Sequence, residues 1–161
     1  MIHIAVLKQN YLDMVLSGEK RVECRLTRNR IEPFGRIRVD QRVYLKESSG
    51  PFRATARVSR VELFEELEPE GVEKLRLEYG EAIGAPDTFW DSKRTARYGV
   101  LLWFKKVQEV YRGPKIPALN GRGWLMLSQE NDVYPGCLTK SAKEARDARN
   151  PPTKSGSSDA R

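Results

Sequence analysis

Hydrophobic and polar positions alternate along several short stretches of this chain, which is the pattern of strands with one buried face. The alternation predicts strands at residues 22–28, 36–39, 42–45 and 53–63, and further short strands are expected at residues 3–7 and 124–127. In the 36–39 strand it places Ile37 and Val39 on one face and the arginines on the other. Residues 98–111 contain an unbroken apolar run, which predicts a central strand covered on both faces.

A short helix is predicted over residues 11–17, where the spacing changes to the helical period. Leu12 and Val15 fall on one apolar face, Asn10 suits the N-cap, and Gly18 suits the C-terminal end. This helix separates the first two predicted strands.

A second helix is predicted at residues 70–79. Pro69 suits its first turn, acidic residues follow, and Gly80 comes directly after it. The stretch 83–91, which contains Pro86, is expected to be irregular. Strands with a few helices predict the α+β class.

The length of 161 residues predicts one compact domain, which we place at residues 1–138. Residues 139–161 are charged, and the stretch 151–158 has no core-forming residue, so these residues are predicted to form a disordered tail. A charged helix over residues 140–149 is the alternative for its first part.

Charge is distributed unevenly within a net charge of +7. Residues 20–60 hold 12 basic against 4 acidic side chains, whereas residues 61–92 hold 2 against 10. A basic face attracts polyanions and releases their counterions on binding. Alternatively, the acidic segment neutralises the basic strands within the fold.

The sequence argues against several kinds of catalytic or metal site and against a membrane location. The one histidine, His3, argues against a histidine metal site or a Ser-His-Asp triad, so Ser128 is not assigned as a nucleophile. Cys24 and Cys137 have neither disulfide nor metal-site spacing. No cofactor or metal is expected. No apolar run could cross a membrane and no signal segment is visible, so a cytoplasmic location is expected.

The segment from Gly18 to Arg25 concentrates charged groups where a helix gives way to a strand. Strand alternation places Arg21, Glu23 and Arg25 on one face, and Lys20 lies at the preceding turn. Two interpretations stay open: a solvated face whose surface salt bridge contributes under about 1 kcal/mol, or the floor of a polar site.

The Gly-x-Lys-x-x-Glu-x-Arg pattern at residues 18–25 follows a Lys-Gln-Asn-Tyr segment at 8–11 and Leu-Ser-Gly at 16–18. This combination resembles the N-terminal signature of ASCH domains in the PUA-like superfamily. The resemblance implies a small mixed β-barrel with flanking helices and a cleft. It also implies binding of RNA or a modified nucleotide. Some relatives hydrolyse acylated cytidine nucleosides, and others are reported as ribonucleases.

The resemblance also implies positions for candidate residues. Lys8 and Tyr11 are placed at the cleft mouth, where Tyr11 would stack on a base or pack on the core. Lys20 and Glu23 become the catalytic candidates if the protein is an enzyme. Hydrolases of this family carry a threonine three residues after the motif lysine, and this chain has Glu23 there.

Further candidates come from the basic strands and the tryptophans. Arg57 is expected to extend the basic face, and Arg122 lies in a Gly-Arg-Gly segment before Trp124, where it would meet a phosphate. Trp90, beside charged residues, is a candidate stacking residue, and Trp103 is expected in the core. For Trp90 and Trp124 the alternative is a tryptophan at the edge of the core.

Three functions are compatible with these patterns. The first is a basic cleft that binds RNA or a nucleotide through Lys8, Tyr11, Lys20, Arg21, Glu23, Arg25, Arg57, Arg122 and Trp124. The second is a hydrolase of RNA or acylated nucleosides that uses Lys20 and Glu23. The third is a protein-binding module that uses the acidic helix 70–79. We expect the first.

Overall fold

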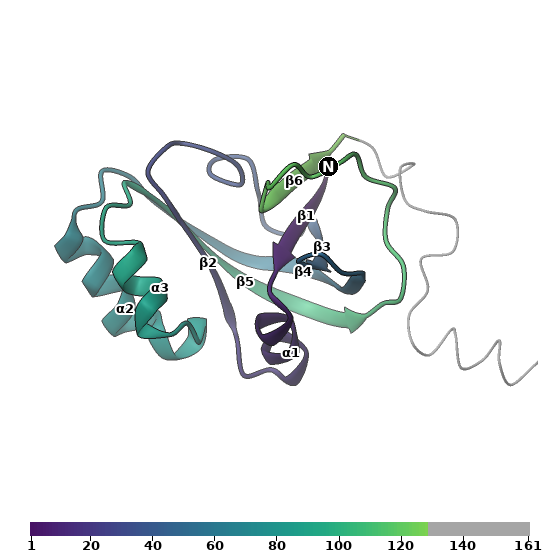
Figure 1. Ribbon diagram of the computed structural model, residues 1–161, viewed down its shortest axis with the longest axis horizontal. Helices are drawn as coiled ribbons and strands as arrows, with labels where there is room; N and C mark the ends of the chain where they lie inside the picture. The colour runs from purple at the N-terminus through teal and green to yellow at the C-terminus, as the bar shows by residue number, and fades with distance from the viewer. Residues whose placement is uncertain (129–161) are drawn as a thin grey trace, which may run out of the picture.

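A computed structural model describes residues 1–128, which form one six-stranded sheet with three helices (Figure 1). The strands are β1 (Ile2–Leu7), β2 (Val22–Thr27), β3 (Arg42–Glu47), β4 (Phe52–Phe64), β5 (Tyr98–Glu109) and β6 (Trp124–Leu127). The helices are α1 (Gln9–Ser17), α2 (Pro69–Ile83) and α3 (Asp87–Ser92).

The strand order in the sheet is β2-β5-β4-β3-β1-β6. β1 and β3 pair in parallel, and the other neighbours are antiparallel. The long β4–β5 pair changes register between Thr55 and Arg57 and again between Val58 and Arg60. Such bulges bend and twist a strand pair, which fits the curled, half-barrel shape of this sheet.

The hydrophobic core has two main parts, one on each side of the sheet. Inside the curl, Leu12 and Val15 of α1 pack with side chains of β1, β3, β4 and β5. On the other side, α2 and α3 cover β2 and β5 (Figure 1). Val100 belongs to the first part and the adjacent Leu101 to the second, so the prediction that β5 is covered on both faces is confirmed.

The predicted strand at 36–39 is wrong, because this segment turns instead of extending. The backbone N–H groups of Arg36 and Ile37 both donate to the carbonyl of Pro33, and Asp40 has a φ of 68°. Ile37 is 3% exposed and Val39 is 50% exposed, so they do not share a buried face.

The helix predictions are correct in place but not in extent. α1 begins at Gln9 with Lys8 at the N-cap position, so Asn10 is not the cap. α2 continues through Gly80 and ends at Ile83, and Gly84 follows as the C-cap with a left-handed φ of 69°. The segment expected to be irregular contains α3.

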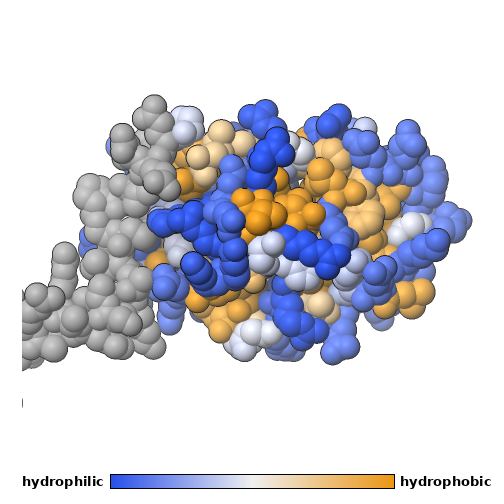
Figure 2. Space-filling view, turned by 180° about the vertical axis from the view of Figure 1, so that it is seen from behind, coloured by the Kyte–Doolittle hydropathy of each residue, from blue (hydrophilic) through white to orange (hydrophobic). Residues whose placement is uncertain are grey.

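The structure describes residues 1–128 only, which bears on the predicted tail and on the search for membrane-spanning helices. Residues 129–161, which include Cys137 and the tail predicted at 139–161, lie outside this range. Among the helices of residues 1–128, none is both long enough and apolar enough to cross a membrane. On the back face, hydrophilic side chains are interleaved with apolar ones (Figure 2).

Candidate functional site

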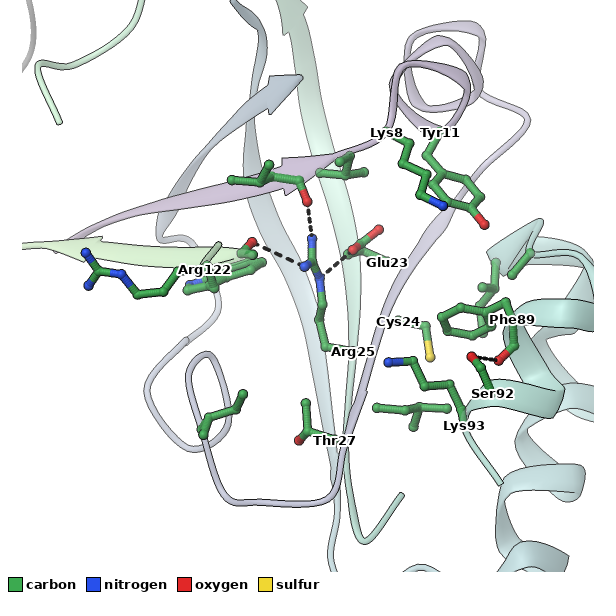
Figure 3. Close-up of a pocket in the computed structure, with 18 of the residues that line it drawn as sticks. Lys8, Tyr11, Glu23, Cys24, Arg25, Thr27, Phe89, Ser92, Lys93 and Arg122 are labelled. Atoms are coloured by element: carbon green, nitrogen blue, oxygen red, sulfur yellow. Dashed lines mark hydrogen bonds and ion pairs between the residues drawn. The ribbon is translucent and has the colours of Figure 1, made fainter. Parts of the chain in front are cut away.

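An open cleft of about 1060 Å³ lies between α1, β2, α3 and the segment before β6. Figure 3 shows that Tyr11 of α1, Glu23 and Arg25 of β2 and Phe89 of α3 face one space, whereas the guanidinium of Arg122 is directed away from it. Most of the site residues predicted from the sequence line it: Lys8, Tyr11, Lys20, Glu23, Arg25, Arg122 and Trp124.

Lys20 lies in the cleft wall with a side chain that is only 4% exposed. The left-handed Gly18 turns the chain out of α1 and brings Lys20 back toward that helix, where its N–H donates to the carbonyl of Met14 at 3.0 Å. The side-chain Nζ donates to the carbonyls of Val22 at 2.9 Å and Ile83 at 2.6 Å.

The third partner of Lys20 is Glu23, whose Oε2 lies 3.5 Å from Nζ. Of the three donors of the ammonium, two have carbonyl acceptors, and the carboxylate adds an ion pair. The Tyr11 ring also faces this ammonium, 5.3 Å from its centroid. Lys20 is therefore held from all sides.

Arg25 connects three segments at the centre of the cleft (Figure 3). Its Nη groups donate to the carbonyl of Val6 at 3.0 Å and to that of Gly123 at 3.2 Å. Its Nε lies 2.7 Å from Oε1 of Glu23, close enough for an ion pair but not aligned as a hydrogen bond. The guanidinium also lies over the Trp124 ring, 5.4 Å from the ring centroid.

Lys20, Glu23 and Arg25 therefore form a row of alternating charges, here called the charged clasp. The interpretation of this motif as a solvated face is wrong, because as whole residues Glu23 is 5% exposed and Lys20 is 7% exposed. Arg21 stays on the surface outside the cleft, and its backbone N–H pairs with the carbonyl of Ala82.

Trp124 forms part of the cleft floor and is 5% exposed. Its Nε1–H donates to Nδ1 of His3 at 3.2 Å, and Nε2 of His3 lies 2.9 Å from Oε1 of Gln41. These partners select the neutral imidazole that carries its proton on Nε2. Burial lowers the pKa of His3, in agreement with a neutral ring. His3 thus supports the indole from behind.

The rim of the cleft is basic. The ammonium groups of Lys8 and Lys93 have no ion-pair partner within residues 1–128, and Lys93 lies 5.8 Å from the centroid of the Phe89 ring. Arg122 donates through Nε and Nη2 to carbonyls of its own turn, which fixes its position. Among the lining residues Glu32 and Glu23 are the acidic ones.

Phe89 and Lys93 were missed from the sequence, since residues 83–91 were expected to be irregular. α3 turns Phe89 and Lys93 toward the cleft and places Trp90 in the core at 3% exposure, so the exposed position considered for Trp90 is wrong. Asp87 after Pro86 was the available signal, because both suit the start of a helix.

Arg57 is not brought to the cleft. It lies on β4 and donates through Nη1 to the backbone carbonyl of Asp40 at 3.0 Å. Trp103 packs at the edge of the α2–α3 core beneath Arg60, whose guanidinium lies 4.4 Å from its ring centroid.

The cleft contains one thiol, and its surroundings make it unreactive. Burial, with the Glu23 carboxylate beside it, raises the pKa of Cys24 to about 12. Burial, again with Glu23, raises the pKa of the Tyr11 hydroxyl, which therefore stays a hydrogen-bond donor at neutral pH. Within residues 1–128, no group of His, Cys, Asp and Glu side chains is arranged to hold a metal ion.

The fold is that of ASCH domains. The structure of ASCH from Zymomonas mobilis superposes with a TM-score of 0.59 at 12% identity, over 80% of this chain and 89% of that one. A mutant form of the same protein gives a TM-score of 0.55 at 11% identity, over 91% and 96%. No protein-family model matches the sequence, and no curated protein matches it. The small α+β fold with a mixed, curled sheet and flanking helices that the motif led us to expect is therefore confirmed.

Proposed function

We propose that the cleft binds RNA or a modified nucleotide. The observation that carries the proposal is the separation of two kinds of cation. Lys20 and Arg25 are paired with Glu23 and with backbone carbonyls in the clasp, whereas Lys8 and Lys93 at the rim have no ion-pair partner within residues 1–128. Free ammonium groups around a hollow attract phosphates.

Aromatic side chains supply the second component of such a site. Tyr11 of α1 and Phe89 of α3 line the same cleft as the free cations and are partly exposed, whereas Trp124 is buried in the floor beneath Arg25. Bases that are not paired stack on aromatic side chains in proteins that bind single strands. The combination favours a nucleotide over a purely anionic ligand such as a dicarboxylate.

The clasp has a separate role in this proposal. Its carboxylate, Glu23, is held at a fixed position by Lys20 and Arg25 and lines the cleft. A carboxylate accepts hydrogen bonds only, so it would select a base edge or a ribose hydroxyl that donates. Lys20 and Arg25 would thus contribute by positioning Glu23.

The contacts of Lys20 favour binding over the alternative, a hydrolase with Lys20 and Glu23 in the chemistry. A lysine that acts as a base or nucleophile needs a free electron pair on nitrogen. Here Nζ uses two N–H bonds for backbone carbonyls and lies beside a carboxylate. This arrangement stabilises an ammonium in a fixed position.

The test is a titration of the protein with single-stranded RNA, duplex RNA and duplex DNA at two salt concentrations. We expect RNA to bind more tightly at low salt. We expect Lys8→Ala and Lys93→Ala each to weaken binding and to reduce the salt slope by about 1. Lys74→Ala, on the exposed side of α2, is the matched control and should bind as the native protein does.

Two results would contradict the proposal. One is an absence of RNA binding even at low salt. The other is an equal effect of Lys74→Ala and the rim substitutions, which would mean that the overall charge, and not the cleft, attracts the polyanion.

A further inference from the structure

A second hollow of about 330 Å³ adjoins the cleft at the C-terminal end of β2. The two hollows share lining residues from β2, from the loop after it and from α3 with the residue that follows: Leu26, Thr27, Ile31, Ser92 and Lys93. The second hollow adds Arg28, Asn29, Thr95 and Ala96. The two spaces therefore lie next to each other, from α1 to beyond the end of β2, and are here together called the trough.

The chemistry of the second hollow differs from that of the cleft. No aromatic ring and no carboxylate lines it, while Arg28 and Lys93 make it basic and Asn29 and two threonines add neutral polar groups. A hollow of this composition suits a phosphate and a sugar better than a base, because it offers donors but no stacking surface.

Arg28 is positioned for this task. Its Nε donates to Oγ1 of Thr95 at 2.9 Å, which fixes the guanidinium against the segment after α3. Among residues 1–128 its two Nη groups have no acceptor. An arginine held through Nε presents both Nη groups together, which is the geometry that binds two phosphate oxygens at once.

We propose that this hollow, here called the Arg28 subsite, binds the phosphate of a nucleotide that adjoins the one in the cleft. This proposal rests on the proposed function and restricts its ligand to an RNA strand of at least two nucleotides, which excludes a free nucleoside. Lys93 lies at the boundary and lines both spaces, so its ammonium is placed near the phosphate that links the two nucleotides (Figure 3).

The size of the trough agrees with a ligand longer than one nucleotide. Ligand pockets usually measure about 300–1,000 Å³. The cleft alone, at about 1060 Å³, already reaches the upper end of that range, and the Arg28 subsite extends it further in one direction.

The experiment compares ligands of increasing length by calorimetric titration. The probes are the four ribonucleosides, their 5′ and 3′ monophosphates, and a single-stranded RNA hexanucleotide of mixed sequence. We expect the hexanucleotide to bind at least about tenfold more tightly than any monophosphate. We expect Arg28→Ala to remove most of that difference and to leave binding of the nucleosides unchanged.

Two further variants separate position from charge. Arg38→Ala removes an exposed arginine that lines neither hollow, and it should bind the hexanucleotide as the native protein does. Arg28→Lys keeps the charge but loses the paired Nη groups, so it should restore only part of the affinity. Thermal unfolding of each variant checks that it is folded.

The outcomes distinguish this inference from the proposed function. If monophosphates bind as tightly as the hexanucleotide, and Arg28→Ala behaves like Arg38→Ala, the Arg28 subsite is wrong while the nucleotide-binding cleft stands. If no probe binds at low salt, both proposals are wrong.

Discussion

Lys20 has surroundings that are unusual for a lysine. Its ammonium lies among two backbone carbonyls, one carboxylate and one aromatic ring, with little access to water. Burying an ammonium is costly unless opposite charge and hydrogen bonds compensate for the lost hydration. The carbonyl of Ile83 at the end of α2 and the Glu23 carboxylate of β2 supply that compensation, so the charged clasp is first a structural unit.

The clasp predicts a large effect of a conservative change at Lys20. Lys20→Met keeps the shape of the side chain but leaves two carbonyls and part of the Glu23 charge without a donor. We expect the free energy of unfolding to fall by about 3–5 kcal/mol, measured by urea denaturation. Lys74→Met is the control, and its change should stay within about 0.5 kcal/mol.

The same variant tests the alternative function. A Lys20→Met protein with native stability that has lost turnover of RNA or acylated nucleosides would show a catalytic lysine and would contradict a structural role for the clasp. Because the clasp holds the cleft together, Lys20→Ala and Arg25→Ala are poor probes of binding: they disturb the fold of the cleft together with its charge.

The position at which α2 ends determines where the Ile83 carbonyl and the following helix α3 lie. Two glycines, Gly80 and Gly84, lie at or near the end of α2, and the first was expected to terminate the helix. Gly80 stays helical and Gly84 takes the left-handed turn. The additional turn brings the carbonyl of Ile83 to Lys20 and places α3 beside the cleft.

The two glycines predict opposite results for one substitution. At Gly80, a Cβ would meet Arg76 Cγ at 3.8 Å, an ordinary contact, so Gly80→Ala should stabilise the protein by about 1 kcal/mol. At Gly84, a Cβ would clash with Met14 Cε, and φ is +69°, so Gly84→Ala should be destabilising. Urea denaturation measures both, and equal changes in the two variants would contradict these assignments.

The molecule as a whole contains one histidine. This residue, His3, lies on β1 and contacts Trp124 of β6 and Gln41 in the loop before β3. His3 is fully buried and accepts a hydrogen bond from the Trp124 indole through Nδ1. Protonation of Nδ1 would replace this acceptor with a donor. The neutral ring is therefore a condition for the native packing of the cleft floor.

This arrangement predicts how global stability depends on pH. The pKa of His3 is lowered from 6.5 in the folded state, so below pH 6.5 the unfolded chain binds more protons than the native one. The free energy of unfolding should therefore decrease as pH falls from 7 toward 5.5, by at most about 1.4 kcal/mol per pH unit. Urea denaturation at several pH values measures the slope.

His3→Gln provides the control for this dependence. It removes the group that titrates in this range while keeping a polar side chain, so its stability should vary little between pH 5.5 and 7. A slope in His3→Gln equal to the native slope would mean that another group causes the dependence.

Local patterns in the sequence predicted much of the fold. Local patterns placed β1, β2, β3, β4 and β6 within a residue or two of their ends, although five of the six residues of β1 are buried. Alternation matches one buried face most clearly in β4. It failed at 36–39, where Ile37 and Val39 alternate correctly but the Asp40 turn points them to different surroundings. α3 was not predicted, since a helix of six residues carries too little periodic signal.

The candidate site was predicted in part for similar reasons. Lys8, Tyr11, Lys20, Glu23 and Arg25 lie within one short stretch, so a single motif identifies them. Arg122 and Trp124 reach the same cleft because β6 pairs with β1. Phe89 and Lys93 reach it because α3 packs on the sheet, a contact that a linear pattern does not contain.

The sequence by itself determined the class of fold, the succession of strands along the chain and the concentration of charge near Lys20, because side-chain periodicity and local composition are properties of neighbouring residues. Only the tertiary structure decided which charged side chains have hydrogen-bond and ion-pair partners in the fold and which lie at the surface of the cleft without an ion pair. Lys20 and Lys93 have the same side chain, but Lys20 is enclosed by its neighbours Val22 and Glu23 together with the carbonyl of Ile83 from the distant α2, and Lys93 lies at an open rim. That difference depends on contacts between segments far apart in the chain, and it separates the clasp from the proposed binding surface.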